Sequence, residues 1–167
     1  MAQFVMKHKV KEKFGTTHSG DNGGDSGGAR GLTAADFEIS SAATSTEEIG
    51  NPVYPPARRL LNSKGIDCSG HKARQMTQRD FDYYDYIVLM DRNNLRNLRW
   101  ILGREIHPEK DRKISMMMDW TDRAGDVADP WYTGDFEATW RDVNEGCDGL
   151  LEHIMGRKMK CKQEQQP

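Results

Sequence analysis

Apolar positions form their clearest pattern near the C-terminal end of the chain. From Phe136 onward, apolar residues recur at spacings of three and four, which is the period of one buried helix face; they are Phe136, Trp140, Val143, Cys147, Leu150, Leu151 and Ile154. This spacing predicts a helix from about Phe136 to Met155, with Cys147 in the core. A second helix is predicted over residues 1–14, because apolar residues lie roughly along one side with lysines between them.

Short apolar runs predict buried strands. Tyr86–Met90 is a continuous apolar run, as expected for a strand covered on both faces, and Lys113–Met118 is a second candidate. The segment Asp36–Ser41 is predicted to form a short strand that begins the ordered part of the fold.

Helices are predicted between these strands. Pro55 and Pro56 open a helix that runs to about Lys64 and ends at Gly65. Thr77 begins another, with Asp80 placed as a capping acid, and Asn93–Leu102 forms a third. Strands that alternate with helices predict an α/β fold with a parallel sheet. Since ligands bind at the carboxyl ends of such strands, the loops after Ser41, Met90 and Met118 are expected to share one rim.

Composition bounds the class of protein. The chain has 167 residues with a net charge of −2, 36% hydrophobic and 30% charged residues, so neither nucleic acid nor a membrane is an expected partner. Its three cysteines have no framework spacing, which favours a reducing, cytoplasmic compartment. Residues 1–157 are predicted to form one domain and 158–167 a polar tail. Glycine fills seven of the positions 15–31, which predicts a flexible surface insertion there.

Candidate chemistry lies in a turn-rich loop that runs into the C-terminal helix. Asp129 precedes Pro130 and is followed by Trp131 and Tyr132. These two aromatic residues are able to wall a pocket beside the carboxylate, and a carboxylate against apolar surface is a potential proton donor near neutral pH. Asp135 is predicted to cap the helix instead. Pro130 separates Asp129 from that helix, which makes a capping role weaker for Asp129.

This loop, Asp129–Glu137, resembles the general-acid loop of the low-molecular-weight protein-tyrosine phosphatases. Three more segments resemble blocks of that family in the same order: Ile39–Ser45, His71–Gln75 and Met90–Arg96. The resemblance runs from Asp36 to about Arg157. It implies a three-layer fold in which helices cover both faces of a short parallel sheet. The family's sheet has four strands, and the resemblance implies that the central first strand is missing from this chain.

The resemblance also implies roles for site residues. Asp129 would protonate the leaving phenolic oxygen, and Trp131 and Tyr132 would flank the phosphotyrosine ring. Ser41 and His71 would steady the nucleophile loop, and Asp91 would be an acid near the site. The implied substrate is a phosphotyrosine protein or a small aryl phosphate, hydrolysed through a phosphocysteine without a metal or other cofactor.

The family's defining loop, Cys-x5-Arg-Ser-Pro after the first strand, does not occur in the expected place. Met1–Phe4 resembles the residues that follow that loop, so an N-terminally truncated and inactive chain is expected. Cys68 to Arg74 has the Cys-x5-Arg spacing. It follows a helix, however, whereas a working loop follows a buried strand and precedes a helix N-terminus.

Three alternative interpretations remain. The chain could be a degenerate phosphatase fold that acts only as a binding or regulatory module. It could be a relative of the arsenate reductases, which share the fold. It could also carry a rearranged site in which Cys68 is the nucleophile.

Overall fold

The computed structural model describes residues 1–15, 32–108 and 110–163, except for the side chains of Tyr132 and of residues 157–163. The predicted Gly-rich insertion lies, from residue 16 on, outside the described residues. No helix in the described ranges is long and apolar enough to cross a lipid bilayer.

The sheet consists of two short parallel strands, β1 (Ile87–Leu89) and β2 (Ile114–Met116), with Ile87 opposite Ile114. The backbone N–H of Ile87 donates to the carbonyl of Lys113 at 2.6 Å. The crossover between the strands contains helix α4 (Arg92–Leu102). Two of the predicted strands and the α/β class with a parallel sheet are therefore confirmed.

The third predicted strand, Asp36–Ser41, is wrong. Asp36 ends a short 3-10 helix, η1 (Ala34–Asp36), and Phe37 is extended with φ −114° and ψ 116°. The only isolated bridge between described residues joins Ala43 to Gln75 in parallel, beyond the end of the predicted strand. A strand requires a neighbour that shares its hydrogen bonds, and no described strand lies beside this segment.

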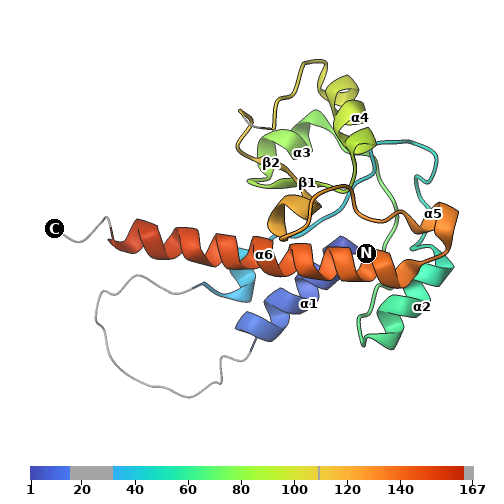
Figure 1. Ribbon diagram of the computed structural model, residues 1–167, viewed down its shortest axis with the longest axis horizontal. Helices are drawn as coiled ribbons and strands as arrows, with labels where there is room; N and C mark the ends of the chain where they lie inside the picture. The colour runs from blue at the N-terminus through green and yellow to red at the C-terminus, as the bar shows by residue number, and fades with distance from the viewer. Residues whose placement is uncertain (16–31, 109, 164–167) are drawn as a thin grey trace.

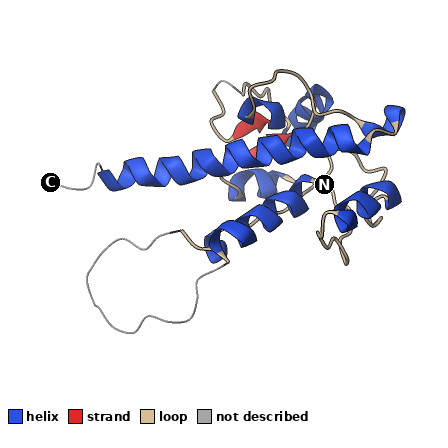
Figure 2. Cartoon of the chain, turned by 60° about the horizontal axis from the view of Figure 1, so that its bottom comes forward, coloured by secondary structure: helices blue, strands red, loops and turns tan. Residues whose placement is uncertain are grey.

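Helices cover both sides of the sheet (Figures 1 and 2). Helix α3 (Gln78–Tyr83) and α4 lie on one side, and α1 (Ala2–Phe14) and α6 (Phe136–Gln163) lie on the other. Helix α2 (Pro55–Ser63) packs near the start of α6, where Lys64 Nζ lies 3.5 Å from Glu137 Oε2. The predicted helices are thus present, and α6 continues beyond the predicted end at Met155.

Two glycines let α6 pack closely on the 3-10 helix η2 (Met117–Trp120). A Cβ atom at Gly146 would lie 2.8 Å from the carbonyl oxygen of Met117, and one at Gly149 would overlap the carbonyl oxygen of Trp120. Any side chain at either position would therefore force α6 away from η2. Between them, Cys147 is 1% exposed, so its predicted place in the core is confirmed.

The apolar interior is divided into two separate clusters. One lies around α1, α6 and η2, and its buried members include Val5, Leu61, Met117, Val143 and Cys147. The other lies around the sheet, α3 and α4, and is formed by Met76, Phe81, Ile87, Leu89, Leu98, Ile106 and Ile114.

The start of α3 has the reciprocal cap that the sequence predicts. Asp80 N–H donates to Thr77 Oγ1 at 3.2 Å, and Asp80 Oδ2 accepts from the Thr77 N–H at 2.9 Å. Arg74 Nη1 donates to the same carboxylate oxygen at 2.8 Å. The Arg74 hydrogen bond is the largest of the effects that lower the pKa of Asp80 from 3.8 to about 2.

We therefore expect Arg74→Met to raise the pKa of Asp80 toward 3.8, as followed by the carboxyl carbon resonance against pH. Because the folded-state pKa is depressed, the stabilisation of α3 is complete above about pH 4 and is lost as the pH falls toward 2. Arg79→Met is the matched control and should leave the pKa of Asp80 at about 2. A wild-type carboxyl that titrates near 3.8 would contradict the expectation.

Candidate active site

A cavity of about 1520 Å³ is lined by residues of β1, α1 and α6, and we call it the central cavity. Its walls are β1 on one side and the segment Glu38–Ala42 on another, and α1 and α6 also contribute residues. Ser41, Asp91 and Asp129, which the sequence predicts as site residues, all line it. The fold therefore brings these three residues to one space.

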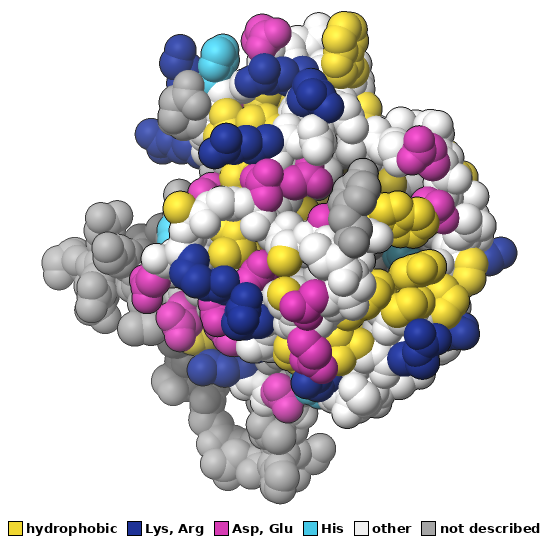
Figure 3. Space-filling model, turned by 45° about the vertical axis from the view of Figure 1, so that its right-hand side comes forward, with side chains coloured by type: hydrophobic (Ala, Val, Ile, Leu, Met, Phe, Trp, Pro, Cys, Tyr) yellow, Lys and Arg dark blue, Asp and Glu magenta, His cyan; other side chains and the backbone are white. Residues whose placement is uncertain are grey.

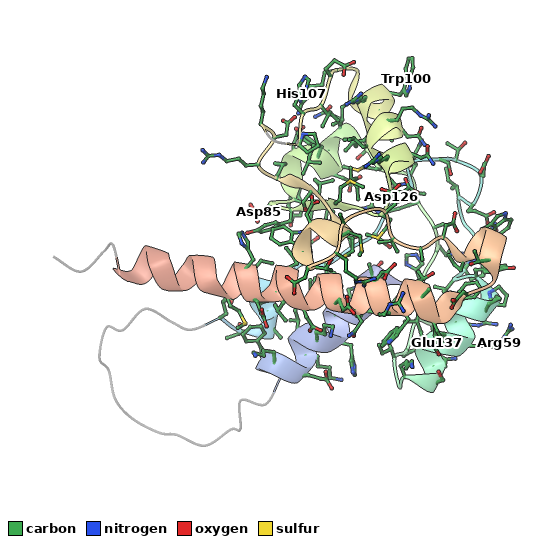
Figure 4. The ribbon with its side chains drawn as sticks, in the orientation of Figure 1. Arg59, Asp85, Trp100, His107, Asp126 and Glu137 are labelled. Atoms are coloured by element: carbon green, nitrogen blue, oxygen red, sulfur yellow. The ribbon has the colours of Figure 1, made fainter. Side chains whose placement is uncertain are left out.

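The loop that carries Asp129 is fixed by the residues around it. Val127 N–H donates to the carbonyl of Met90 at 2.9 Å, just beyond the end of β1. Ala128 N–H donates to Asp142 Oδ2 at 3.0 Å, and Thr139 Oγ1 donates to the Ala128 carbonyl at 2.7 Å. Figure 4 shows this loop, with Asp126 labelled, passing over α6. The backbone directly before Asp129 is thus held by both the sheet and α6.

Asp142 is a functional candidate that the sequence analysis missed. It is 4% exposed, and Arg123 Nη1 lies 2.8 Å from its Oδ1 atom. The pKa of Arg123 is raised by its hydrogen bonds to Glu145 and Asp142, so its charge is secure. Asp142 adjoins Val143 on the apolar face of α6. A carboxylate beside such a face could have identified this residue from the sequence, because a buried charge needs a partner.

Asp129 itself is exposed and caps a short helix, α5 (Pro130–Thr133). Its Oδ1 atom accepts from the Trp131 N–H at 2.9 Å. The expectation that Pro130 weakens a capping role for Asp129 is wrong, because α5 starts at Pro130 and proline is favoured in a first helical turn. Oδ2 of Asp129 accepts no hydrogen bond from the described residues, so one carboxylate oxygen is fixed and the other is available for proton transfer.

The aromatic residues near Asp129 lie at the surface. Trp131 is 66% exposed, and its ring centroid lies 5.7 Å from that of Tyr54, which in turn lies 6.0 Å from Phe136. Figure 3 shows hydrophobic side chains gathered on the face that carries α2 and α5. Trp131 does not line the central cavity, and the side chain of Tyr132 lies outside the described residues. Tyr54, which precedes α2, was not predicted as part of this group.

Ser41 and Asp91 each have a defined partner. Ser41 Oγ donates to Oε1 of Gln3 on α1 at 2.6 Å. Asp91 Oδ1 accepts from the Asn94 N–H at 2.6 Å and so caps α4, while Asn94 Oδ1 accepts from the Met90 N–H at 3.1 Å. Ser41 therefore connects the Glu38–Ala42 wall to α1, and Asp91 fixes the turn between β1 and α4.

His71 lies behind α1 rather than in the central cavity. Its ring packs edge-on against Phe4, with 5.3 Å between centroids. Burial, and then the positive charges of the amino terminus and Lys7, lower the pKa of His71. The imidazole therefore packs against the first turn of α1 and does not line the central cavity.

Cys68 and Arg74 do not form a phosphate-binding loop in this structure. Cys68 is buried and belongs to the core around α1 and α6, whereas Arg74 lines the central cavity and is bonded to Asp80. Ser69 N–H donates to Asp67 Oδ1 at 2.8 Å, which closes a local turn around Cys68. The other described free cysteine, Cys147, does line the cavity, but burial raises the pKa of its thiol to about 12. Its thiol is therefore a poor nucleophile near neutral pH.

Comparison with known proteins shows which family the chain resembles. The sequence model of the family "low molecular weight phosphotyrosine protein phosphatase" matches residues 27–162. The low molecular weight protein-tyrosine-phosphatase YfkJ of Bacillus subtilis is 35% identical over 122 residues, which cover 73% of this chain and 77% of YfkJ. The low molecular weight phosphotyrosine protein phosphatase of Gallus gallus is 36% identical over 121 residues. These residues cover 70% of this chain and 73% of the chicken protein.

Solved structures agree with this assignment. The crystal structure of YfkJ superposes with a TM-score of 0.71 at 26% identity, and the match covers 99% of this chain and 87% of that one. The chain belongs to the low-molecular-weight protein-tyrosine phosphatase family, whose members hydrolyse phosphate esters.

Proposed function

We propose that this chain provides the general-acid half of a phosphotyrosine phosphatase site, with Asp129 as the acid. The observation that carries the proposal is the geometry of its loop. The backbone of Val127 and Ala128 forms hydrogen bonds with Met90, Asp142 and Thr139. Asp129 is the next residue and lines the central cavity. A general acid needs such a fixed position, since its effect of roughly 10²–10⁴ depends on reaching the leaving oxygen.

In the proposed reaction, a thiolate attacks the phosphorus of an aryl phosphate and forms a phosphocysteine. Asp129 gives its proton to the departing phenolic oxygen, and then takes a proton from the water that attacks the phosphocysteine. Ser41 and His71 would steady the nucleophile loop, and Asp91 would fix the neighbouring turn. Trp131, together with Tyr132, would contact the aromatic ring of a phosphotyrosine protein or a small aryl phosphate.

These 167 residues contain no Cys-x5-Arg-Ser/Thr-Pro motif. Neither described cysteine replaces it, because Cys68 lies in the core away from the cavity and Cys147 holds its proton. We therefore propose that turnover requires a nucleophile loop that the 167 residues do not supply. We also propose a reducing compartment such as the cytoplasm, because the three cysteines have no framework spacing.

An assay of aryl phosphate hydrolysis tests this proposal. The chain alone is expected to release no phenol above background, whereas a fusion that adds a first strand and a Cys-x5-Arg-Ser-Pro loop of the family before Met1 is expected to turn over. The same fusion with serine in place of the loop cysteine is the inactive control.

Two outcomes would contradict it. Turnover by the unfused chain that is lost in Cys68→Ser would make Cys68 the nucleophile of a rearranged site. A folded but inactive fusion would favour the second candidate function, a phosphatase fold that only binds its targets. The missing motif is the observation that supports this second candidate.

A further inference from the structure

The outward face of α4 carries the most exposed large apolar side chain of the described residues. Trp100 is 82% exposed, whereas Leu98 on the opposite face of the helix is fully buried. Figure 4 shows Trp100 projecting from the end of α4 that lies away from the Asp126 loop. A single exposed apolar residue is common in proteins, so the residues beside Trp100 decide whether this surface has a partner.

Two arginines share the outward face of α4 with Trp100. Arg92, Arg96 and Trp100 are all exposed and lie four positions apart, so they are successive neighbours along one line of the helix surface. We call these three residues the α4 stripe. Among the described residues, neither Arg92 nor Arg96 forms an ion pair, whereas Arg99 Nη1 lies 3.6 Å from Glu105 Oε2. The stripe therefore presents two unneutralised cations and one apolar ring.

The composition of the α4 stripe indicates the chemistry of its partner. Recognition of an anionic bilayer usually takes a cluster of about 4–8 Lys or Arg residues, and duplex DNA is commonly held by about 6–10 phosphate contacts. Two arginines are too few for either. Arginine pairs well with a carboxylate through two parallel hydrogen bonds, and Trp and Arg are enriched at the energetic centres of protein interfaces. An acidic polypeptide with an apolar anchor fits best.

The spacing of the stripe matches an extended chain. Residues four apart in a helix are separated by about 6 Å along the axis, and alternate residues of an extended chain lie on one face about 6.6 Å apart. Two acidic residues and an apolar residue at alternate positions can thus meet Arg92, Arg96 and Trp100 in turn. Arg92 directly follows Asp91, which lines the central cavity together with Asp129. The stripe therefore starts beside the proposed catalytic site and leads away from it.

We propose that the α4 stripe binds an acidic segment of the protein substrate. In this segment, two carboxylates and one large apolar side chain stand at alternate positions, and the carboxylate nearest to the phosphotyrosine meets Arg92. The proposal rests on the proposed function, because it places the segment on the same polypeptide as the phosphotyrosine. It names the class of substrate as acidic phosphotyrosine proteins, a preference that a small aryl phosphate cannot show.

Binding of an unphosphorylated peptide to the full 167-residue chain and to the fusion tests the stripe without catalysis. The probe has two glutamates and a phenylalanine separated by single alanines, with a fluorescent label, and the readout is anisotropy. Trp100→Ala and Arg96→Glu are each expected to raise its Kd by about tenfold or more, as for a central interface residue. The effect of Arg96→Glu should shrink in about 1 M salt, where charges are screened beyond about 3 Å.

Two controls separate the stripe from general charge attraction. Arg59→Glu makes the same change of charge on α2, far from Trp100 in Figure 4, and is expected to leave the Kd unchanged. A peptide of the same composition with its glutamates adjacent is expected to bind less tightly. Equal binding of the two peptides, or equal weakening by Arg96→Glu and Arg59→Glu, would overturn the proposal.

Other occupants of the stripe would also overturn the proposal. One is a bilayer, shown by binding to vesicles of equal parts phosphatidylserine and phosphatidylcholine that Trp100→Ala abolishes, in the absence of peptide binding. Another is a second copy of the chain, shown by self-association that Trp100→Ala abolishes.

Activity of the fusion tests the link to the substrate. A phosphotyrosine peptide with the motif is expected to have a KM about tenfold lower than the same peptide with alanine at the three motif positions, with kcat unchanged, because remote contacts bind substrate and transition state alike. A motif that binds but leaves the KM of an active fusion unchanged would overturn its assignment to the substrate. An inactive fusion would count against the proposed function alone, since binding of the unphosphorylated peptide needs no turnover.

Discussion

Asp129→Asn is expected to lower the turnover of an aryl phosphate by about 10²–10⁴ in a fusion that supplies the nucleophile loop. Asparagine keeps the size of the side chain and, through its amide oxygen, the hydrogen bond from the Trp131 N–H. It has no acidic proton to give to the phenolic oxygen, so the loss falls on the chemical step. The measurement is kcat with a phenyl phosphate whose leaving group has a high pKa, because such a substrate depends most on protonation.

Two neighbouring carboxylates serve as controls for that loss. Asp135 caps α6 by accepting from the Ala138 N–H at 2.9 Å, and Asp126 is exposed in the loop before Val127. Asp135→Asn and Asp126→Asn should therefore change turnover far less. Equal losses at all three positions would mean that the acid is not Asp129 but another group.

Without an added strand, the 167-residue chain is expected to melt gradually rather than in one sharp transition. A central strand of the kind that the family resemblance implies would bury four or five large apolar side chains. At about 1.5–3 kcal/mol each, their absence removes on the order of 6–15 kcal/mol. This equals the whole stability of a typical domain, which is about 5–15 kcal/mol.

Calorimetry and near-ultraviolet circular dichroism distinguish the two kinds of melting. The chain alone should show a weak, broad heat absorption and should bind a dye that reports exposed apolar surface. The fusion with the first strand should show a sharp transition and little dye binding. A two-state transition of the monomeric chain alone would show that the apolar clusters cooperate without that strand.

Local sequence patterns predicted the helices well, because each carries its own signals. The apolar spacing after Phe136 marks the buried face of α6, and the helix predicted over Asn93–Leu102 is α4, which ends at Gly103 with φ 61°. The predicted end of α6 at Met155 is too early. The residues after Met155 have no apolar period, which suggested an end there, but no proline lies between Met155 and Pro167 to break the helix. The segment Asp36–Ser41 has the composition of a strand, but its state depends on a neighbour that its own residues do not encode.

The candidate site was predictable only in part for the same reason. Asp129, Ser41 and Asp91 follow from motifs, and they do line one cavity. Asp142 and Thr139 hold Ala128 from 14 and 11 positions away in the chain. Their role arises only when α6 packs beneath that loop, so no local pattern could assign it.

The two glycines of α6 connect the packing of this helix to the chemistry at its other end. Gly149 sets how closely the helix approaches Trp120, and Asp142, seven residues earlier and about 10 Å along the same axis, holds Ala128. A helix moves as a unit over this length, so a methyl group at Gly149 would also displace Ala128 and with it Asp129. A substitution at Gly149 would thus misalign the loop of Asp129 from a distance, with the Asp129 side chain itself unchanged.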